Sequence, residues 1–444
     1  MKHLYTVLFS LSIILINPIG RMRGEIWTQP KVFAILLICI FNVLILWEER
    51  DSLNIPQCWK INRLLWEIFL GIGLISTIAS PFPLRSLFAQ EQMGDGLLYW
   101  LLIAIFTLSN NLLLKLHPEL FRSQLQGLII GGVILALSIF PQVINWRIDY
   151  TATTGQLFKD NILASTIFKN HQPIGLYSHR GHASFVLAAC SIISLIGWQK
   201  KVITQRNAVI ALTLIIPALL LTQTRAGIIA FIVGFVTWVY QSGFKNRHRN
   251  RIIICACLVS LLFVGAVSAT RQLVFSDRSN FDKTTLLIKY ISSDREMLWE
   301  RAIRGISMRP LLGWGMNGFG TVYPYIHHGE PVKEVIRLGD FSYDYENKNG
   351  LRRRKQLPTV KAHNLIFDTT LSVGILGLIS YLTLFAFCLW QVIKSPYRGI
   401  EAVLIVYLAF TFTWFECAQF THIAWWVLSL SAHEGYQKTL PKAS

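Results

Sequence analysis

The stretch "KAHNLIFD" (361–368) places His363 beside Lys361 and Asn364 at the point where a long apolar run begins. An imidazole has an ordinary pKa near 6.5, and fixed positive charges close to it favour the neutral form. A neutral imidazole can accept a proton from a hydroxyl group. A histidine at this position is a candidate general base, although an interfacial histidine with a structural role is the alternative.

A second candidate is Arg225 in "LLLTQTRAGIIAFIV", where an arginine is costly unless it faces a cavity or an anion. Its planar guanidinium suits a phosphate or pyrophosphate, and gripping a lipid headgroup is the competing interpretation. Glycosyl transfer from a lipid pyrophosphate requires two kinds of group side by side. Arginines hold the phosphate leaving group, and a neutral histidine acts beside them.

More arginines lie in "SSDREMLWERAIRGISMRPLLGWGMNGFG" (292–320). Its cap candidates and apolar spacing predict a short amphipathic helix that ends at Pro310. Arg295, Arg301, Arg304 and Arg309 fall on more than one face of it. The glycines of "GWGMNGFG" (313–320) predict a turn, because the segment lacks the Lys-Ser/Thr ending of a P-loop. The run "LRRRKQ" (351–356) is typical of a solvated loop or of an anion-binding segment.

The elements that position these residues are apolar runs of membrane-spanning length. The 444 residues are 53% hydrophobic and 15% charged, and the mean hydropathy is +0.45, which is typical of a polytopic membrane protein. The predicted fold is an all-α bundle of about twelve transmembrane helices with a large external loop. The expected spans are 4–20, 31–48, 64–80, 97–115, 125–145, 182–198, 207–223, 225–241, 252–269, 364–393, 400–415 and 417–432.

Three short basic loops without acids set the predicted orientation: 199–206, 242–251 and 394–399. Lysine and arginine accumulate on the cytoplasmic side, so counting spans from these loops places 146–181, the turn at Arg225 and residues 270–363 outside and both termini inside. His363 and Arg225 then share the external face. The organisation predicted is helices one to nine in 1–269, an external loop in 270–363 that carries 16 Lys and Arg against 10 Asp and Glu, and three helices with a cytoplasmic tail in 364–444.

Several classes of function are disfavoured. The net charge of +18 comes from loops between spans, which membrane orientation and lipid headgroups explain, so nucleic acid is not expected as a partner. The seven cysteines make no CxxC pair, and neither a metal nor another cofactor is expected. A transporter of an anion such as bicarbonate stays open as an alternative, although no internal repeat supports it.

The order "TQTRAG", then "DREMLWERAIRGISMRPLLGWGMNGFG", then "AHNLIFDTTLSVGILGLISYL" resembles the O-antigen ligase and polymerase superfamily of bacterial membrane glycosyltransferases. The resemblance covers about 175–393. It implies the C-type glycosyltransferase fold, a periplasmic loop and a location in the bacterial inner membrane. In "GLYSHRGHASF", Gly181 and His182 stand where the family commonly has asparagine, and Ser372 stands where many members have an acid.

By the same resemblance, a glycan passes from undecaprenyl pyrophosphate to an acceptor hydroxyl of lipid A core or another surface glycan. Transfer is metal-independent and inverts the anomeric centre. Arg225 and Arg295 would hold the pyrophosphate, and His363 would activate or orient the acceptor. Secondary candidates are Arg180, His182, Arg301 and Asn364. A polymerase of repeat units and an oligosaccharyltransferase acting on protein remain open as alternatives, because both use the same donor chemistry.

Overall fold

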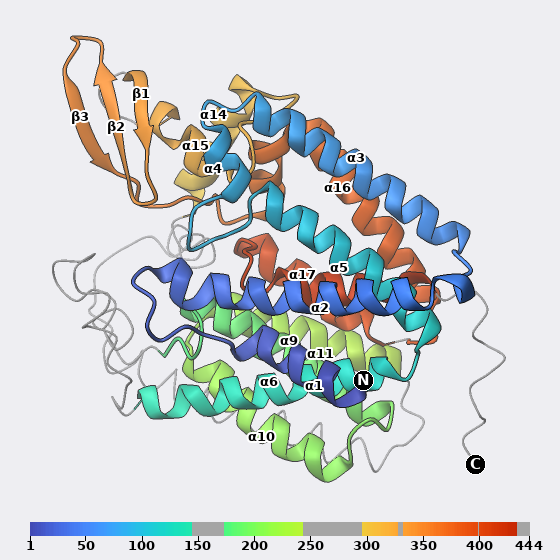
Figure 1. The fold of residues 1–444 in the computed structure, drawn as a ribbon. Coiled ribbons are helices and arrows are strands. Elements are labelled where there is room, and N and C mark those ends of the chain that lie inside the picture. The colour runs from blue at the N-terminus through green and yellow to red at the C-terminus, as the bar shows by residue number, and fades with distance from the viewer. Residues whose placement is uncertain (144–172, 243–294, 327–331, 398, 433–444) are drawn as a thin grey trace.

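Helices make up most of the described chain (Figure 1). The computed structural model describes residues 1–143, 173–242, 295–326, 332–397 and 399–432. Before residue 243 the helices are α1 (Lys2–Ile14), α2 (Gln29–Glu48), α3 (Gln57–Ile78), α4 (Pro83–Phe88), α5 (Leu97–Leu116), α6 (Leu120–Val143), α9 (Arg180–Gln199), α10 (Gln205–Leu221) and α11 (Arg225–Ser242). After residue 294 they are α14 (Glu296–Met308), α15 (Gly318–Ile326), α16 (Leu365–Lys394), α17 (Glu401–Thr413) and α18 (Thr421–Leu428).

Six helices in the described ranges are long and apolar enough to cross a membrane, which confirms the helical membrane class. They are Gly24–Glu48, Gln57–Ile78, Leu97–Leu116, Leu120–Val143, Arg180–Gln199 and Leu365–Lys394. Four shorter apolar helices are Lys2–Ile14, Gln205–Leu221, Arg225–Gln241 and Glu401–Thr413. The expected span 252–269 and most of the predicted external segment 146–181 lie outside the described residues, so the count of twelve stays a prediction.

The core of the bundle surrounds α9, whose residues from Gly181 to Trp198 are all buried. Its neighbours α6, α10, α11 and α17 pack around it. The peripheral helices α2 and α3 instead expose large apolar side chains, including Leu44 and Ile78, as helices do where they face lipid rather than protein. The N-terminal ends of α9 and α11 and the start of α16 carry His179, Arg225 and His363, the residues on which the site depends.

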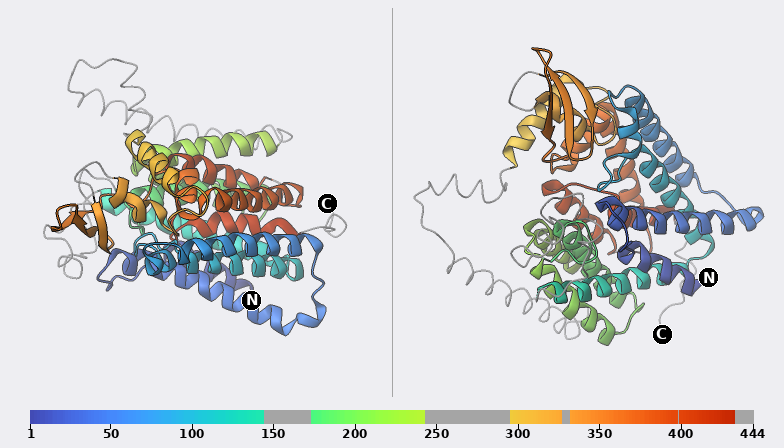
Figure 2. Two further views of the ribbon diagram at one scale, coloured as in Figure 1. Left: turned by 90° about the horizontal axis from the view of Figure 1, so that it is seen from above. Right: turned by 60° about the vertical axis from the view of Figure 1, so that its left-hand side comes forward.

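A small antiparallel sheet, which was not predicted, projects from one end of the bundle (Figure 2). Its strands are β1 (Val332–Leu338), β2 (Ser342–Asn347) and β3 (Arg352–Gln356), in the order β1-β2-β3. Tyr343 and Tyr345 of β2 are buried on one face, whereas Asp344 pairs with Arg354 on the other. The run "LRRRKQ" is therefore mostly an exposed strand rather than a loop. The described part of the segment 270–363 combines the expected helix, found as α14, with this sheet.

The glycine-rich segment that follows α14 packs into a break in α16. Gly374 has φ +71 in the middle of that helix, and Ile375 N–H donates to the Pro310 carbonyl (2.8 Å). Trp314 N–H donates to the Leu371 carbonyl (2.8 Å). A Cβ at Gly374 would lie 2.0 Å from the Leu311 carbonyl oxygen. The glycines thus allow two backbones to approach closely, which supports the prediction of a turn in this segment.

Candidate active site

His363 lies in a short connection between the sheet and α16 and has φ +60. A left-handed conformation costs a residue other than glycine about 1–2 kcal/mol, so its neighbours must hold it. Asn364 fixes the C-terminal side, because its side-chain oxygen caps α16 by accepting from Ile366 N–H (3.0 Å) and Phe367 N–H (3.2 Å). Its amide donates to the Phe412 carbonyl (2.9 Å). Asn364, a secondary candidate from the sequence, therefore has a structural role that occupies both polar atoms.

His363 lines a cavity of about 270 Å³, close to the lower end of small-molecule sites at roughly 300–1,000 Å³. The cavity gathers residues from distant parts of the sequence. One wall comes from the chain between the sheet and α16, and the others come from the start of α9, the connection before α5 and the connection after α17. The lining residues are Arg23, Gln90, Gln92, Met93, His179, His182, Phe341, Leu357, Pro358, Thr359, Val360, Lys361, His363, Trp414 and Phe415.

The imidazole of His363 is neutral at physiological pH. Burial, followed by the charges of Arg295, His179 and Lys361, lowers its pKa to about 3. The sequence predicted the neutral form from positive charge alone, whereas burial is the larger cause. The ring stands edge-on to Trp414 (centroids 5.0 Å apart) and to Phe415 (4.8 Å), which fixes its plane. Its Nδ1 atom is buried without a hydrogen-bond partner in the described part of the chain.

Arg295 lies just before α14, and its charge acts on His363. Its guanidinium stacks on the Trp414 ring, with Cζ 5.0 Å from the ring centroid, and donates to the Thr413 carbonyl. Burial lowers its pKa to about 10, so it keeps its charge at neutral pH. The protein thus holds the plane of the guanidinium beside a neutral histidine, and an oxyanion could bind to its remaining N–H groups.

Arg225 and Arg180 begin α11 and α9 at the same end of the bundle. Their charges repel each other, and the charge of Arg180 acts in turn on His179. His179 lines the cavity and acts electrostatically on His363. Arg225 is exposed. Like charges held together are unfavourable unless an anion lies near them. The structure therefore brings Arg225, Arg180, His179 and His363 into one electrostatic cluster, as counting spans predicted.

The other two secondary candidates have different positions. His182 is fully buried in α9 and lines the cavity, with Nδ1 3.3 Å from Ser178 Oγ. Arg301 points to α15, where it donates to the Tyr323 hydroxyl (3.2 Å) and lies over that ring. Arg301 is absent from the lining of the cavity. His182 thus stays a candidate for substrate contact, while the described contacts of Arg301 hold α14 against α15.

Sequence reasoning missed cavity residues that come from the N-terminal third of the chain. Arg23 and Gln92 lie on either side of α2 and α3 in sequence, far from every recognised motif. His179 stood inside the stretch "YSHRGHASF" but was not selected. Burial at the mouth of α9 lowers the pKa of His179 to about 4, with the charges of Arg180 and Arg23 as further causes. His179 and His363 are therefore both neutral side chains of the same cavity wall, to which His182 also belongs.

Comparison with known proteins places the cluster in a recognised domain. Residues 208–382 match the family model described as O-Antigen ligase, and this range contains Arg225, Arg295 and His363. This match and the relatives named as polysaccharide ligases support the O-antigen ligase superfamily. With six helices among the described residues that are long and apolar enough to cross a membrane, the chain is a multi-pass membrane protein, and the family match and relatives support a membrane enzyme of the glycosyltransferase type.

Three relatives are similar to this chain, and two of them match more of it than the domain does. A protein of Rickettsia typhi named as a polysaccharide ligase is 24% identical over 392 residues, which cover 84% of this chain and 82% of the relative. A polysaccharide ligase of Rickettsia felis is 24% identical and covers 71% of this chain and 65% of the relative. A general O-oligosaccharyltransferase of Acinetobacter baylyi is 24% identical over 189 residues, or 38% of this chain and 33% of the relative.

Proposed function

We propose that this protein transfers a glycan from undecaprenyl pyrophosphate to an acceptor hydroxyl of lipid A core or another surface glycan at the periplasmic face of the bacterial inner membrane. One observation carries the proposal. The neutral His363 lines a cavity at one end of an apolar bundle, and the charge of Arg295 acts on it. Arg180 acts on His179 in the wall of the same cavity, and Arg225 acts on Arg180. This composition suits a substrate whose tail lies in lipid and whose reactive bond lies at the headgroup level.

The arginines act on the leaving group. Arg225 and Arg295 hold the pyrophosphate, and Arg180 adds charge beside Arg225. Guanidinium groups bind phosphate oxygens with charge-assisted hydrogen bonds, which strengthen as negative charge builds on the departing oxygen. The repulsion between Arg180 and Arg225 is relieved when the anion binds. Their arrangement therefore favours the transition state, in which the leaving group carries the most charge.

His363 acts on the acceptor. The acceptor oxygen bonds to the anomeric carbon while the bond from that carbon to the pyrophosphate oxygen breaks, and the electron pair leaves with pyrophosphate. The acceptor proton passes to the imidazole, and the anomeric centre inverts. With a pKa of about 3, His363 by itself is a weak base. A bound pyrophosphate raises that pKa, so the base strengthens when the donor is in place.

The names of the relatives differ in what they say about the reaction, which bears on the identity of the acceptor. The Rickettsia proteins are named as polysaccharide ligases, and the Acinetobacter protein is named as an O-oligosaccharyltransferase. Both names fit transfer to a hydroxyl. The cavity wall contains Phe341, Trp414 and Phe415, and aromatic faces of this kind can pack against sugar rings. We therefore favour a glycan acceptor over a protein hydroxyl.

Release of polyprenyl pyrophosphate tests the proposed reaction. Purified protein is mixed with a polyprenyl-pyrophosphate glycan and a crude acceptor fraction, and wild type is compared with Arg225→Ala. We expect release by wild type and loss of release in the variant. Arg63→Ala is the matched control, because Arg63 is exposed and pairs with Glu67 on α3, outside the cluster. No release by wild type with competent donor and acceptor would refute the transferase assignment.

A further inference from the structure

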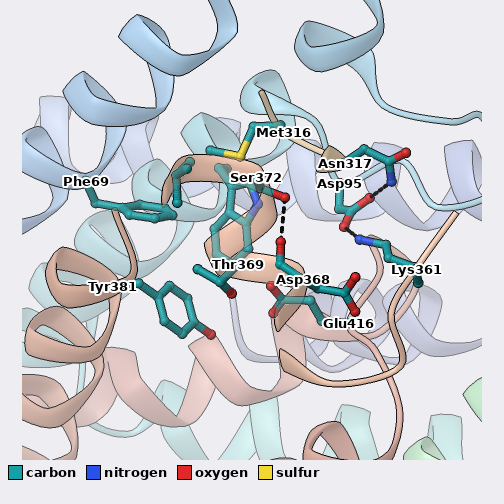
Figure 3. A pocket seen from close by; sticks show the side chains of 12 residues that line it. Phe69, Asp95, Met316, Asn317, Lys361, Asp368, Thr369, Ser372, Tyr381 and Glu416 are labelled. Atoms are coloured by element: carbon teal, nitrogen blue, oxygen red, sulfur yellow. Dashed lines mark hydrogen bonds and ion pairs between the residues drawn. The ribbon is translucent and has the colours of Figure 1, made fainter. Parts of the chain in front are cut away.

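A buried group of charged side chains lines a second, smaller space, which shares Lys361 with the wall of the cavity (Figure 3). Lys361 is 4% exposed, and its ammonium contacts the carboxylate of Asp95, which is 5% exposed. Asp368 and Glu416 lie beside them. The space enclosed by this group is only about 20 Å³, about the volume accessible to one water molecule. A sugar or a phosphate does not fit in this space, so the carboxylates of Asp95, Asp368 and Glu416 do not bind substrate there, whereas Lys361 also lines the larger cavity.

The group instead contacts the two residues on the N-terminal side of His363. Asp368 Oδ1 accepts from Ala362 N–H at 2.7 Å, and Lys361 is held by Asp95, itself contacted by the Asn317 amide (3.4 Å). Thr359 Oγ1 donates to the Lys361 carbonyl (3.0 Å). The two residues that precede His363 are therefore each fixed by a carboxylate. Asp95 belongs to the connection before α5, and Asp368 belongs to the first turn of α16.

Burial of these charges costs free energy, so efficient packing alone does not explain why charged rather than apolar side chains stand here. Moving a paired ammonium and carboxylate out of water costs several kcal/mol per ion, and a well-packed apolar pair is often as stable. Burial acts to lower the pKa of Lys361, but the carboxylates of Asp95 and Asp368 outweigh it and raise the pKa above its ordinary value. Lys361 is thus charged and held by a directional contact, which an apolar side chain does not provide.

We propose that Asp95 and Asp368 are positioning residues that keep His363 in its left-handed conformation and aimed into the cavity, Asp95 through Lys361 and Asp368 through the Ala362 amide. The inference rests on the proposed transfer reaction, in which His363 must meet the acceptor oxygen. An error of about 1 Å in the position of a reacting group can lower a rate by on the order of 100-fold. Asp95→Asn is therefore expected to lower kcat by about 10- to 100-fold with the KM for the donor nearly unchanged.

A double variant separates positioning from simple charge compensation. Asp95→Asn leaves Lys361 without its carboxylate, whereas Asp95→Asn combined with Lys361→Met removes both charges. If the pair serves stability alone, the double variant recovers both wild-type unfolding behaviour and wild-type kcat. If the pair positions His363, the double variant recovers stability while kcat stays low. Recovery of kcat in the double variant, or a normal kcat in a stable Asp95→Asn protein, would overturn the inference.

Amide hydrogen exchange gives a readout that needs no substrate. Asp95 holds Lys361, the residue next to Ala362, whose N–H donates to Asp368. Loss of the contact between Asp95 and Lys361 should loosen this segment, so a peptide that covers 358–368 is expected to exchange faster in Asp95→Asn than in wild type. Asp344→Asn is the matched control, because Asp344 pairs with Arg354 on the exposed face of the sheet; it should leave this peptide and kcat unchanged. If wild type lacks transferase activity, the proposed reaction fails, while the exchange result still reports whether Asp95 orders the segment.

Discussion

Replacing His363 with glutamine is expected to make folding less sensitive to acid. Burial, followed by the charges of Arg295, His179 and Lys361, lowers the pKa of His363 to about 3 in the folded protein, against about 6.5 in an unfolded chain. A depressed pKa means that the folded state favours the neutral imidazole. Its contribution to stability is therefore complete above about pH 6.5 and is lost as pH falls toward about 3.

The size of the effect follows from the two pKa values. Between about pH 7.5 and about pH 4.5 the imidazole becomes protonated in the unfolded chain but stays neutral in the folded one, which corresponds to roughly 2–3 kcal/mol of lost stability. Glutamine does not titrate, so between these two pH values the free energy of unfolding of His363→Gln should fall by roughly 2–3 kcal/mol less than that of wild type. The free energy of unfolding of both proteins can be measured in detergent by chemical denaturation, followed by tryptophan fluorescence.

The control is His3→Gln, which changes an exposed imidazole near the N-terminus. It should show the full wild-type sensitivity to acid. An equal loss of stability on acidification in wild type and in His363→Gln would refute the account of a buried neutral imidazole, and with it the electrostatic basis of the site.

Three further substitutions test other parts of the structure. Arg295→Lys keeps the charge but loses the planar group stacked on Trp414, so the initial transfer rate should fall by roughly 10- to 100-fold; a rate equal to wild type would exclude a specific guanidinium contact. Asn364→Ala removes the cap of α16 and should lower the free energy of unfolding by about 1 kcal/mol, while a null effect would argue against the capping role. Gly374→Ala places a methyl group against the Leu311 carbonyl at 2.0 Å and should reduce the yield of monodisperse protein in size-exclusion chromatography; normal yield would show that the break in α16 adapts.

The sequence predicted the helices well, because apolar runs of spanning length have few alternatives to a helix in a membrane. The expected span 364–393 is found as α16 (Leu365–Lys394). The prediction that Arg225 and His363 share one face came from counting spans between the basic loops, and the structure places Arg225, Arg180, His179 and His363 in one chain of electrostatic interactions. The break at Gly374 was not, because only the packed segment 310–318 explains a left-handed glycine inside a continuous apolar run.

The sheet and the N-terminal part of the site were missed for physical reasons. The strand β2 alternates buried tyrosines with charged residues. The basic run 351–356 that follows it favours a solvated loop, so the sequence does not indicate that the two segments pair as strands. Arg23 and Asp95 reach the site only through contacts across hundreds of residues, which no local spacing records. The relation between Asp95 and Lys361 depends on the three-dimensional packing of α5 against the chain before α16.

The most direct test of the central claim compares wild type with His363→Ala in a transfer assay that also measures donor binding. Wild type should move the glycan to the acceptor and release polyprenyl pyrophosphate. His363→Ala should insert in the membrane and bind the donor through Arg225 and Arg295, yet form no transferred product. A His363→Ala protein that transfers glycan at the wild-type rate would contradict the assignment of His363 as the group that activates or orients the acceptor.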